Sequence, residues 1–159
     1  MGFDVEIRLV LDLLIATVLG ALIGLERERH VGIAGIRTHA AVALGSCLFG
    51  FISFNVTGPD GIDAIVGRAD PSRIAAQIVS GIGFLGAGVI LRDRGHIRGL
   101  TTAASVWASA SIGLGIANHM YVLSVAATII MLLLLSLYRV PGWYKWKNKH
   151  RRRIEKNGD

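Results

Sequence analysis

The sequence has little of the charge that a soluble protein of this size carries on its surface. Only 18% of its 159 residues are charged, whereas 52% are hydrophobic, a balance that is typical of membrane proteins. It contains one cysteine, so an intramolecular disulfide and a cysteine-based zinc cluster are both excluded. That residue, Cys47, lies in an apolar run and is expected to be a small buried side chain.

The sequence also lacks the short motifs of common enzyme sites. It has no HExxH pattern and no glycine-rich phosphate loop that follows a strand. Gly81, Gly83 and Gly86 match a dinucleotide-binding fingerprint in their letters alone, because they lie inside an apolar run. We therefore expect a protein that is not an enzyme and has no cofactor, and the sequence leaves any metal site unknown.

Five apolar runs are long enough, or nearly so, to cross a bilayer as helices. They cover residues 7–25, 38–56, 72–91, 101–116 and 120–137. The expected fold class is an all-α membrane protein with five transmembrane helices, formed by residues 1–140. Residues 141–159 are expected to be a basic, aromatic cytoplasmic tail. Thr38 is expected to cap the second helix, and Asp70 with Pro71 is expected to begin the third.

The positive charge lies between the apolar runs and in the tail, rather than on one exposed face. The net charge is +6, and with five spans fourteen of the seventeen Lys and Arg residues fall on the same side of the membrane. The positive-inside rule then places the N-terminus outside and the C-terminus in the cytoplasm. We expect the lipid bilayer to be the main partner of this charge, and no nucleic acid.

Small residues recur at helical spacing and predict close packing of helices. Those assigned to helix packing are Gly20, Gly24, Gly81, Gly83, Gly86 and Gly88. A second series, Thr101, Ser105, Ser109 and Gly113, repeats every four residues and should face the interior. The third and fourth helices are therefore expected at the centre of the bundle, and the fifth is expected to face lipid. The surplus of glycine faces also predicts a homo-oligomer, with a dimer favoured.

Three polar side chains are expected within the apolar runs, namely Asp12, Arg73 and Gln77. A carboxylate inside a membrane is a functional candidate, although Asp12 lies near the helix start and can pair with Arg8 four residues earlier. Gln77 can either form a hydrogen bond between helices or line a site, and the sequence does not decide between these roles.

A polar cluster is expected where the helices meet the cytoplasm. Its members are Glu26, Arg27, Glu28, Arg37, Thr38, Arg92, Arg98, Thr101 and Thr102. Glu26 and Arg37 are expected to meet, Arg98 to approach them from a short hairpin, and Arg27 to point to water. On charge spacing alone, a set of solvated flanking residues is the favoured interpretation of this cluster.

Three separated motifs resemble the MgtC/SapB family. They are GALIGLERE with GIRTHA in residues 20–40, RIAAQIVSGIGFLGAGVIL in 73–91 and IRGLTTAASVWASASIG in 97–113. The resemblance implies a multi-pass protein of the bacterial inner membrane that supports growth under magnesium limitation and, in some pathogens, virulence. It also favours interpreting the polar cluster as a functional or structural site rather than as flanking charge.

The family resemblance implies a regulatory role on another membrane protein. The alternative is a small-ion transporter or channel for Mg²⁺ or another cation, for which the apolar runs offer few carboxylates. Many members of the family carry a cytoplasmic C-terminal domain of the ACT type. This sequence departs from that pattern, because only the short basic tail follows Tyr138.

Overall fold

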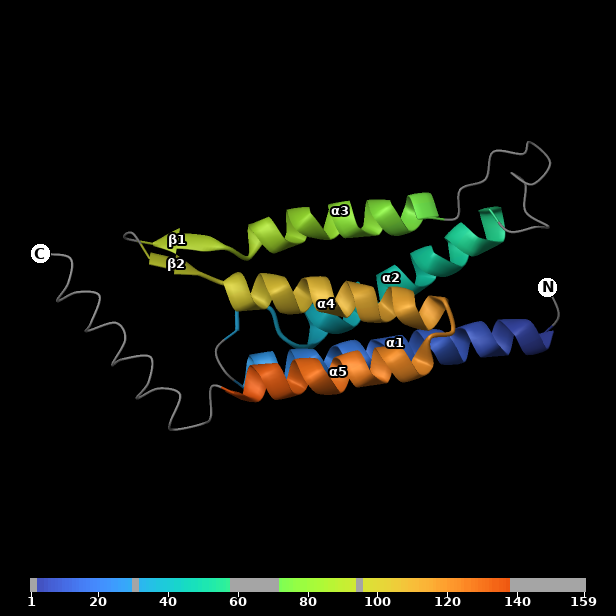
Figure 1. Ribbon diagram of the computed structural model, residues 1–159, viewed down its shortest axis with the longest axis horizontal. Helices are drawn as coiled ribbons and strands as arrows, with labels where there is room; N and C mark the ends of the chain where they lie inside the picture. Colours follow the sequence, from blue (N-terminus) through green and yellow to red (C-terminus); the bar gives the residue numbers. More distant parts are fainter. Residues whose placement is uncertain (1–2, 30–31, 58–71, 94–95, 138–159) are drawn as a thin grey trace, which may run out of the picture.

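The computed structural model describes residues 3–29, 32–57, 72–93 and 96–137 (Figure 1). Within these residues the chain forms five helices and one small hairpin. The helices are α1 (Phe3–Glu28), α2 (Ile36–Thr57), α3 (Ser72–Gly88), α4 (Leu100–Ala117) and α5 (Tyr121–Ser136). Strands β1 (Leu91–Asp93) and β2 (His96–Arg98) are antiparallel and connect α3 to α4. The expected helix start at Asp70 and Pro71 and the tail at 141–159 lie outside the described residues.

Three of these helices are long and apolar enough to cross a membrane. They are α1, the segment Ile36–Ser53 of α2, and α4. The apolar parts of the other two helices are shorter, at Ala75–Gly88 in α3 and Tyr121–Ser136 in α5. Side chains such as Val122 and Leu133 on α5 are more than half exposed, which suits contact with lipid rather than water.

The core of the bundle is a layer in which α2 packs between α1 and α4. Helices α1 and α4 approach α2 most closely at Ala43. A Cβ atom on Gly20 of α1 would lie 2.7 Å from the Ala43 Cβ, and one on Gly113 of α4 would collide with the Ala43 backbone. Small residues thus allow three backbones to meet, as expected for helices that associate through close packing in a bilayer. Cys47, one turn further along α2, is fully buried, which confirms its predicted environment.

Helix α3 lies at the edge of the bundle, which corrects its expected place at the centre. It packs against α4 and, more loosely, against α2 (Figure 1). An apolar groove of 790 Å³ separates α3 from α2. Cβ atoms on Gly81, Gly83 and Gly88 would meet no other atom within 4 Å, and one on Gly86 would touch only Ala103. Glycine density alone does not bury a helix, because burial depends on which neighbours complement its surface.

Helix α4 has the interior position that its sequence pattern predicts. Ser105 and Ser109 are fully buried, and Gly113 is buried too, whereas Trp107 is about half exposed. The first position of the predicted interior series is wrong: Thr101 is exposed, and its neighbour Thr102 is the buried residue. Helix α5 covers α4 through its small polar residues, Ser124 and Thr128, and presents its large aliphatic side chains outward.

The hairpin is joined to α4 through Gly99. Gly99 has φ 89°, in the left-handed region that only glycine adopts without strain, and it directly precedes the helix. Any Cβ atom there would collide with the Val89 carbonyl group at the end of α3. Only glycine suits this junction, from which the hairpin extends beyond the bundle (Figure 1).

Candidate functional site

The end of α1 and the start of α2 are joined by the Glu28 carboxylate. Its Oε2 accepts a hydrogen bond of 3.1 Å from the backbone N–H of Ile36, the first residue of α2. This contact satisfies one of the four free amides at the helix start and places negative charge at the positive end of the helix dipole. Thr38, the expected cap, instead lies inside the first turn of α2 and is exposed. The cap was missed because it comes from the preceding helix.

Arg27 points into the bundle, which corrects the expectation that it faces water. Its guanidinium donates a hydrogen bond of 2.9 Å to the Thr102 hydroxyl of α4, and Thr102 is only 1% exposed. The Arg27 Nε is also buried and has no hydrogen-bond partner among the described residues. A charged donor held in this way binds its acceptor more strongly than a solvated one, because the local dielectric constant is lower.

Behind Thr102 lies a buried histidine that sequence reasoning did not single out. His39 of α2 is fully buried, and its Nδ1 lies 2.9 Å from the Gly35 carbonyl oxygen. A carbonyl oxygen can only accept, so Nδ1 carries a proton. The Nε2 atom lies 2.9 Å from the Ser105 hydroxyl of α4. His39 therefore links the start of α2 to the middle of α4.

The serine completes a continuous polar network across α1, α2 and α4. The Ser105 hydroxyl lies 2.9 Å from the Thr102 carbonyl oxygen as well as from the imidazole of His39. One hydroxyl proton cannot serve both acceptors at once, so Ser105 can exchange between them. We call Arg27, His39, Thr102 and Ser105 the buried network.

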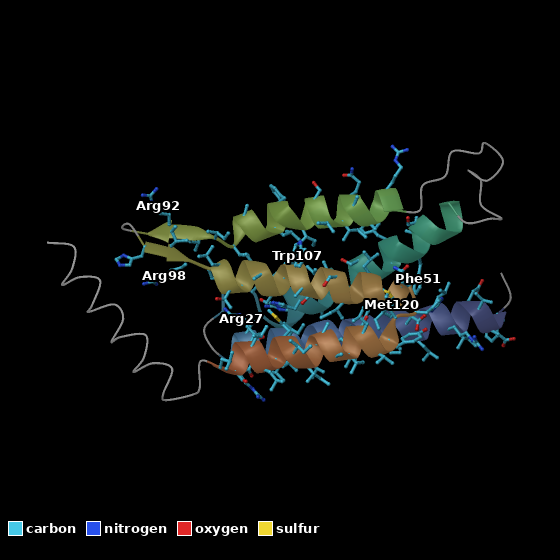
Figure 2. All side chains as sticks on the ribbon, viewed as in Figure 1. Arg27, Phe51, Arg92, Arg98, Trp107 and Met120 are labelled. Carbon is cyan, nitrogen blue, oxygen red and sulfur yellow. The ribbon has the colours of Figure 1, made fainter. Side chains whose placement is uncertain are left out.

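The remaining members of the predicted cluster stay at the surface. Arg37, Thr101, Arg92 and Arg98 are exposed, and Glu26 is partly buried. Figure 2 shows Arg92 and Arg98 on the hairpin, which extends past the end of the bundle that carries Arg27. The structure thus brings together Arg27 with Thr102, and Glu28 with the start of α2. The expected approach of Arg98 to the cluster is corrected, because the hairpin points away from it.

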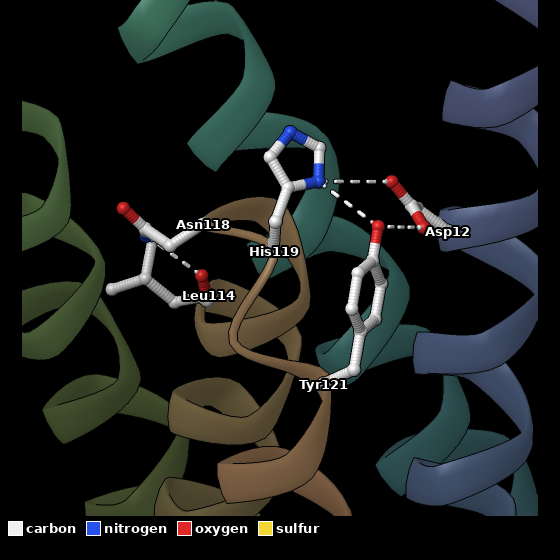
Figure 3. Close-up of polar contacts among 5 residues, drawn as sticks. All are labelled: Asp12, Leu114, Asn118, His119 and Tyr121. Atoms are coloured by element: carbon white, nitrogen blue, oxygen red, sulfur yellow. Dashed lines mark hydrogen bonds and ion pairs between the residues drawn. The ribbon is translucent and has the colours of Figure 1, made fainter.

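The polar residues expected inside the membrane have different positions. Arg73 and Gln77 on α3 are exposed. Asp12 is only 4% exposed, but no ion pair joins it to Arg8 in the described part of the chain. Its Oδ1 accepts a hydrogen bond of 2.9 Å from the Tyr121 hydroxyl of α5 (Figure 3). The predicted partner one turn away is therefore replaced by a partner from another helix.

Comparison with known proteins identifies the family. The family model for the MgtC family matches residues 13–141. The chain belongs to the MgtC family. Its match to "Protein MgtC" of Salmonella typhimurium LT2 is 50% identical over 123 residues, which is 77% of this chain and 49% of that protein. The chain thus spans about half the length of this relative.

Two further relatives extend the comparison. The "Putative magnesium transporter YhiD" of Escherichia coli K12 is 40% identical over 130 residues, covering 81% of this chain and 60% of YhiD. An "Uncharacterized protein" of Haemophilus influenzae is 42% identical over 142 residues, or 88% of this chain and 60% of that protein. No solved structure matches the chain. With its apolar helices, this MgtC-family chain is a membrane protein.

Proposed function

We propose that this MgtC-family chain is a non-enzymatic regulator of the bacterial inner membrane that supports growth when magnesium is scarce. Its membership of the MgtC family and its long apolar helices support the membrane role. The observation that carries the proposal is the buried network. Because hydrogen-bonded polar groups hold buried helices in one arrangement, the network gives α1, α2 and α4 a defined cytoplasmic end that another membrane protein can recognise.

A magnesium transporter is the second candidate, and the name of the YhiD relative favours it. A cation path through a membrane normally uses inward-facing carboxylates or rings of carbonyl oxygens. Among the described residues Asp12 is the one buried carboxylate, and it is engaged by Tyr121. The buried network itself includes the permanently charged guanidinium of Arg27, which repels cations. Regulation therefore accounts better for this interior than transport.

The proposed arrangement has five spans, with the N-terminus outside and the C-terminus in the cytoplasm. The positive-inside rule supports it, because Arg27, Arg92 and Arg98 then share the cytoplasmic side. We also propose a homodimer. Gly20 and Gly24 are already occupied by α2 within one chain, so a second copy would use α3. The exposed amide of Gln77 could there pair with its own copy, since an amide both donates and accepts.

The regulatory role is tested by complementation in low magnesium. The host is a bacterial strain that lacks its own MgtC-family gene, and membrane abundance is checked by blotting. Arg27→Ala and Thr102→Val should both fail to support growth, because each removes one end of the hydrogen bond to α4. Arg29→Ala is the matched control, since Arg29 is exposed two residues further along. Full complementation by both network variants at normal abundance would refute the role of the buried network.

Regulation and transport are separated by a flux measurement. The purified chain is reconstituted in liposomes that contain a Mg²⁺-sensitive dye, with Gln77→Ala and protein-free liposomes as controls. A regulator should give the same Mg²⁺ influx as protein-free liposomes. Influx that depends on the protein would establish transport and overturn the regulatory proposal, and its loss in Gln77→Ala would place the path along α3.

A further inference from the structure

The contacts of Asp12 are not explained by the buried network, which lies near the other end of α1. Asp12 is only 4% exposed, yet its Oδ2 is buried and has no hydrogen-bond partner among the described residues. A carboxylate oxygen that is withdrawn from water without a hydrogen bond is costly. The carboxylate therefore depends on a neighbouring group that can supply positive charge.

The group that can supply this charge is the imidazole ring of His119, in the turn between α4 and α5 (Figure 3). Its Nδ1 lies 3.6 Å from Asp12 Oδ2, a separation that makes an ion pair when the ring is protonated. The His119 side chain is 65% exposed, so it can take up a proton from the surrounding water. The pair thus joins a buried carboxylate to a ring whose charge follows the pH of the medium.

The Tyr121 hydroxyl determines which nitrogen of the ring carries a hydrogen. It donates its one proton to Asp12 Oδ1 at 2.9 Å, so the phenol oxygen can only accept a further hydrogen bond. His119 Nδ1 lies 3.0 Å from that oxygen and therefore carries a hydrogen. The neutral ring with its hydrogen on Nδ1 and the protonated ring both satisfy this geometry. Protonation thus adds charge beside the carboxylate without rearranging the contact.

The turn that carries His119 is anchored on α4. His119 has φ 57°, a left-handed conformation that is uncommon for residues other than glycine. Its backbone N–H donates a hydrogen bond of 2.9 Å to the Ile116 carbonyl, and the Asn118 side chain donates one of 2.9 Å to the Leu114 carbonyl. Because the turn is tied to α4 in this way, an ion pair between His119 and Asp12 connects α4 to α1.

The other ionisable groups near the pair decide the sign of its pH dependence. Among the described residues they are Arg8 of α1, which lines the same cavity, Cys47 of α2 and Tyr121 of α5. Helix α4 has no ionisable side chain. Arg8 repels a protonated ring, but it is exposed and water screens its charge. Asp12 is buried 3.6 Å away, where the lower dielectric constant strengthens its attraction, so the pair favours the protonated ring.

We propose that Asp12 and His119 form a pH-dependent clasp, an ion pair that holds α1 against the turn between α4 and α5. In a mildly acidic medium the ring is protonated and the clasp is closed. As the pH rises through the range in which histidine loses its charge, Asp12 loses its cationic partner and the clasp weakens. With the N-terminus outside, as proposed above, the clasp responds to acidity outside the cell. The ion pair itself depends neither on that orientation nor on the regulatory proposal, so each can fail separately.

The clasp adjoins the buried core, and this proximity provides the assay. Ala16, one turn after Asp12, and Ala117, two residues before His119, belong to the same buried cluster as Cys47. Separation of α1 from the turn should therefore expose Cys47, the only cysteine of the chain, more often. The purified chain in detergent is mixed with a thiol-reactive dye. The labelling rate is measured at about pH 5.5 and at about pH 8, close to the two limits of the range in which histidine changes its charge.

The first variant, His119→Gln, keeps a hydrogen-bond donor but cannot take up the charge. At about pH 5.5 it should label about fivefold faster than the wild type, the factor that corresponds to an ion pair of about 1 kcal/mol. At about pH 8 the two proteins should label at similar rates. Comparison at equal pH cancels the pH dependence of the thiol and of the other histidines, including His39. His96→Gln, at an exposed position on the hairpin, is the matched control and should label like the wild type at both pH values.

A second comparison tests whether His119 acts through Asp12. In an Asp12→Asn background, the further change His119→Gln should alter the labelling rate little at either pH, because the carboxylate is gone. Equal labelling of the wild type and His119→Gln at about pH 5.5 would overturn the proposal. An effect of the same size at both pH values, or a fivefold effect that persists in the Asp12→Asn background, would also overturn it. His119 is exposed, so the comparison with the wild type remains decisive even if Asp12→Asn impairs folding.

Discussion

Replacing Gly113 by alanine should destabilise the fold, because α4 presses against α2 at this point. The added Cβ would collide with the carbonyl group of Ala43, whose position is fixed on the other side by Gly20 of α1. A side chain could rotate away from such a collision, but backbone can move only if whole helices separate. Gly113→Ala therefore tests whether close packing of three backbones holds the bundle together.

The expected cost follows from the effect of overpacking. Extra methyl groups in packed cores typically cost about 1–3 kcal/mol, and a collision with backbone belongs at the upper end. Since every 1.4 kcal/mol corresponds to a factor of ten, a cost of about 3 kcal/mol raises the open population about 100-fold. The matched control is Gly83→Ala, whose Cβ would meet no atom within 4 Å and whose packing cost should therefore be close to zero.

Cys47 supplies the assay, because it is the only cysteine and is fully buried one turn from Ala43. The purified protein in detergent is mixed with a thiol-reactive dye, and the labelling rate is followed. When closing is faster than labelling, this rate is proportional to the open population. Gly113→Ala should label about 100 times faster than Gly83→Ala. Equal rates for these two variants would show that α2 and α4 do not meet as described.

Three further predictions concern the end of the bundle that carries Arg27 and the topology of the chain. Thr102→Val removes the acceptor of the buried guanidinium and should lower the free energy of unfolding by about 1.5–3 kcal/mol. Thr101→Val, at the exposed neighbouring position, should lower it little, and the same labelling assay measures both variants. Glu28→Ala should lower the free energy of unfolding by about 1 kcal/mol, because α2 loses its cap. Glu28→Gln keeps an acceptor and should retain most of this stability, so comparable losses in the two variants would argue against capping. In a cysteine-free background, Asn118→Cys should react with an impermeant maleimide in intact cells and His96→Cys only after permeabilisation, and the reverse pattern would invert the topology.

Much of the architecture follows from local properties of the sequence. Long apolar runs favour helices in a membrane protein, because a helix satisfies its own backbone hydrogen bonds. The short basic segment between the third and fourth runs favours a hairpin, so the five helices and the hairpin near Arg92 could be predicted from the residues alone. Burial of Cys47 and of the small face of α4 was also predictable, because a helical repeat of serine and glycine complements a close neighbour. The family was recognisable from three motifs, which the family model over residues 13–141 confirms.

The tertiary structure decided what each helix packs against. Gly20 and Gly83 look equivalent in the sequence, but only Gly20 meets another backbone, because α2 returns beside α1 while α3 is left at the edge. The environments of the charged residues were likewise decided by the tertiary structure. Arg27 lies in the last turn of α1 and Arg29 directly follows the helix, and whether either faces a hydroxyl or solvent depends on the rotation of α1 against α4. His119 and Asp12 are likewise distant along the chain, and their proximity arises because the turn after α4 brings α5 back beside α1. Helix formation depends on neighbours in the sequence, whereas these pairings depend on how helices distant along the chain rotate and pack together.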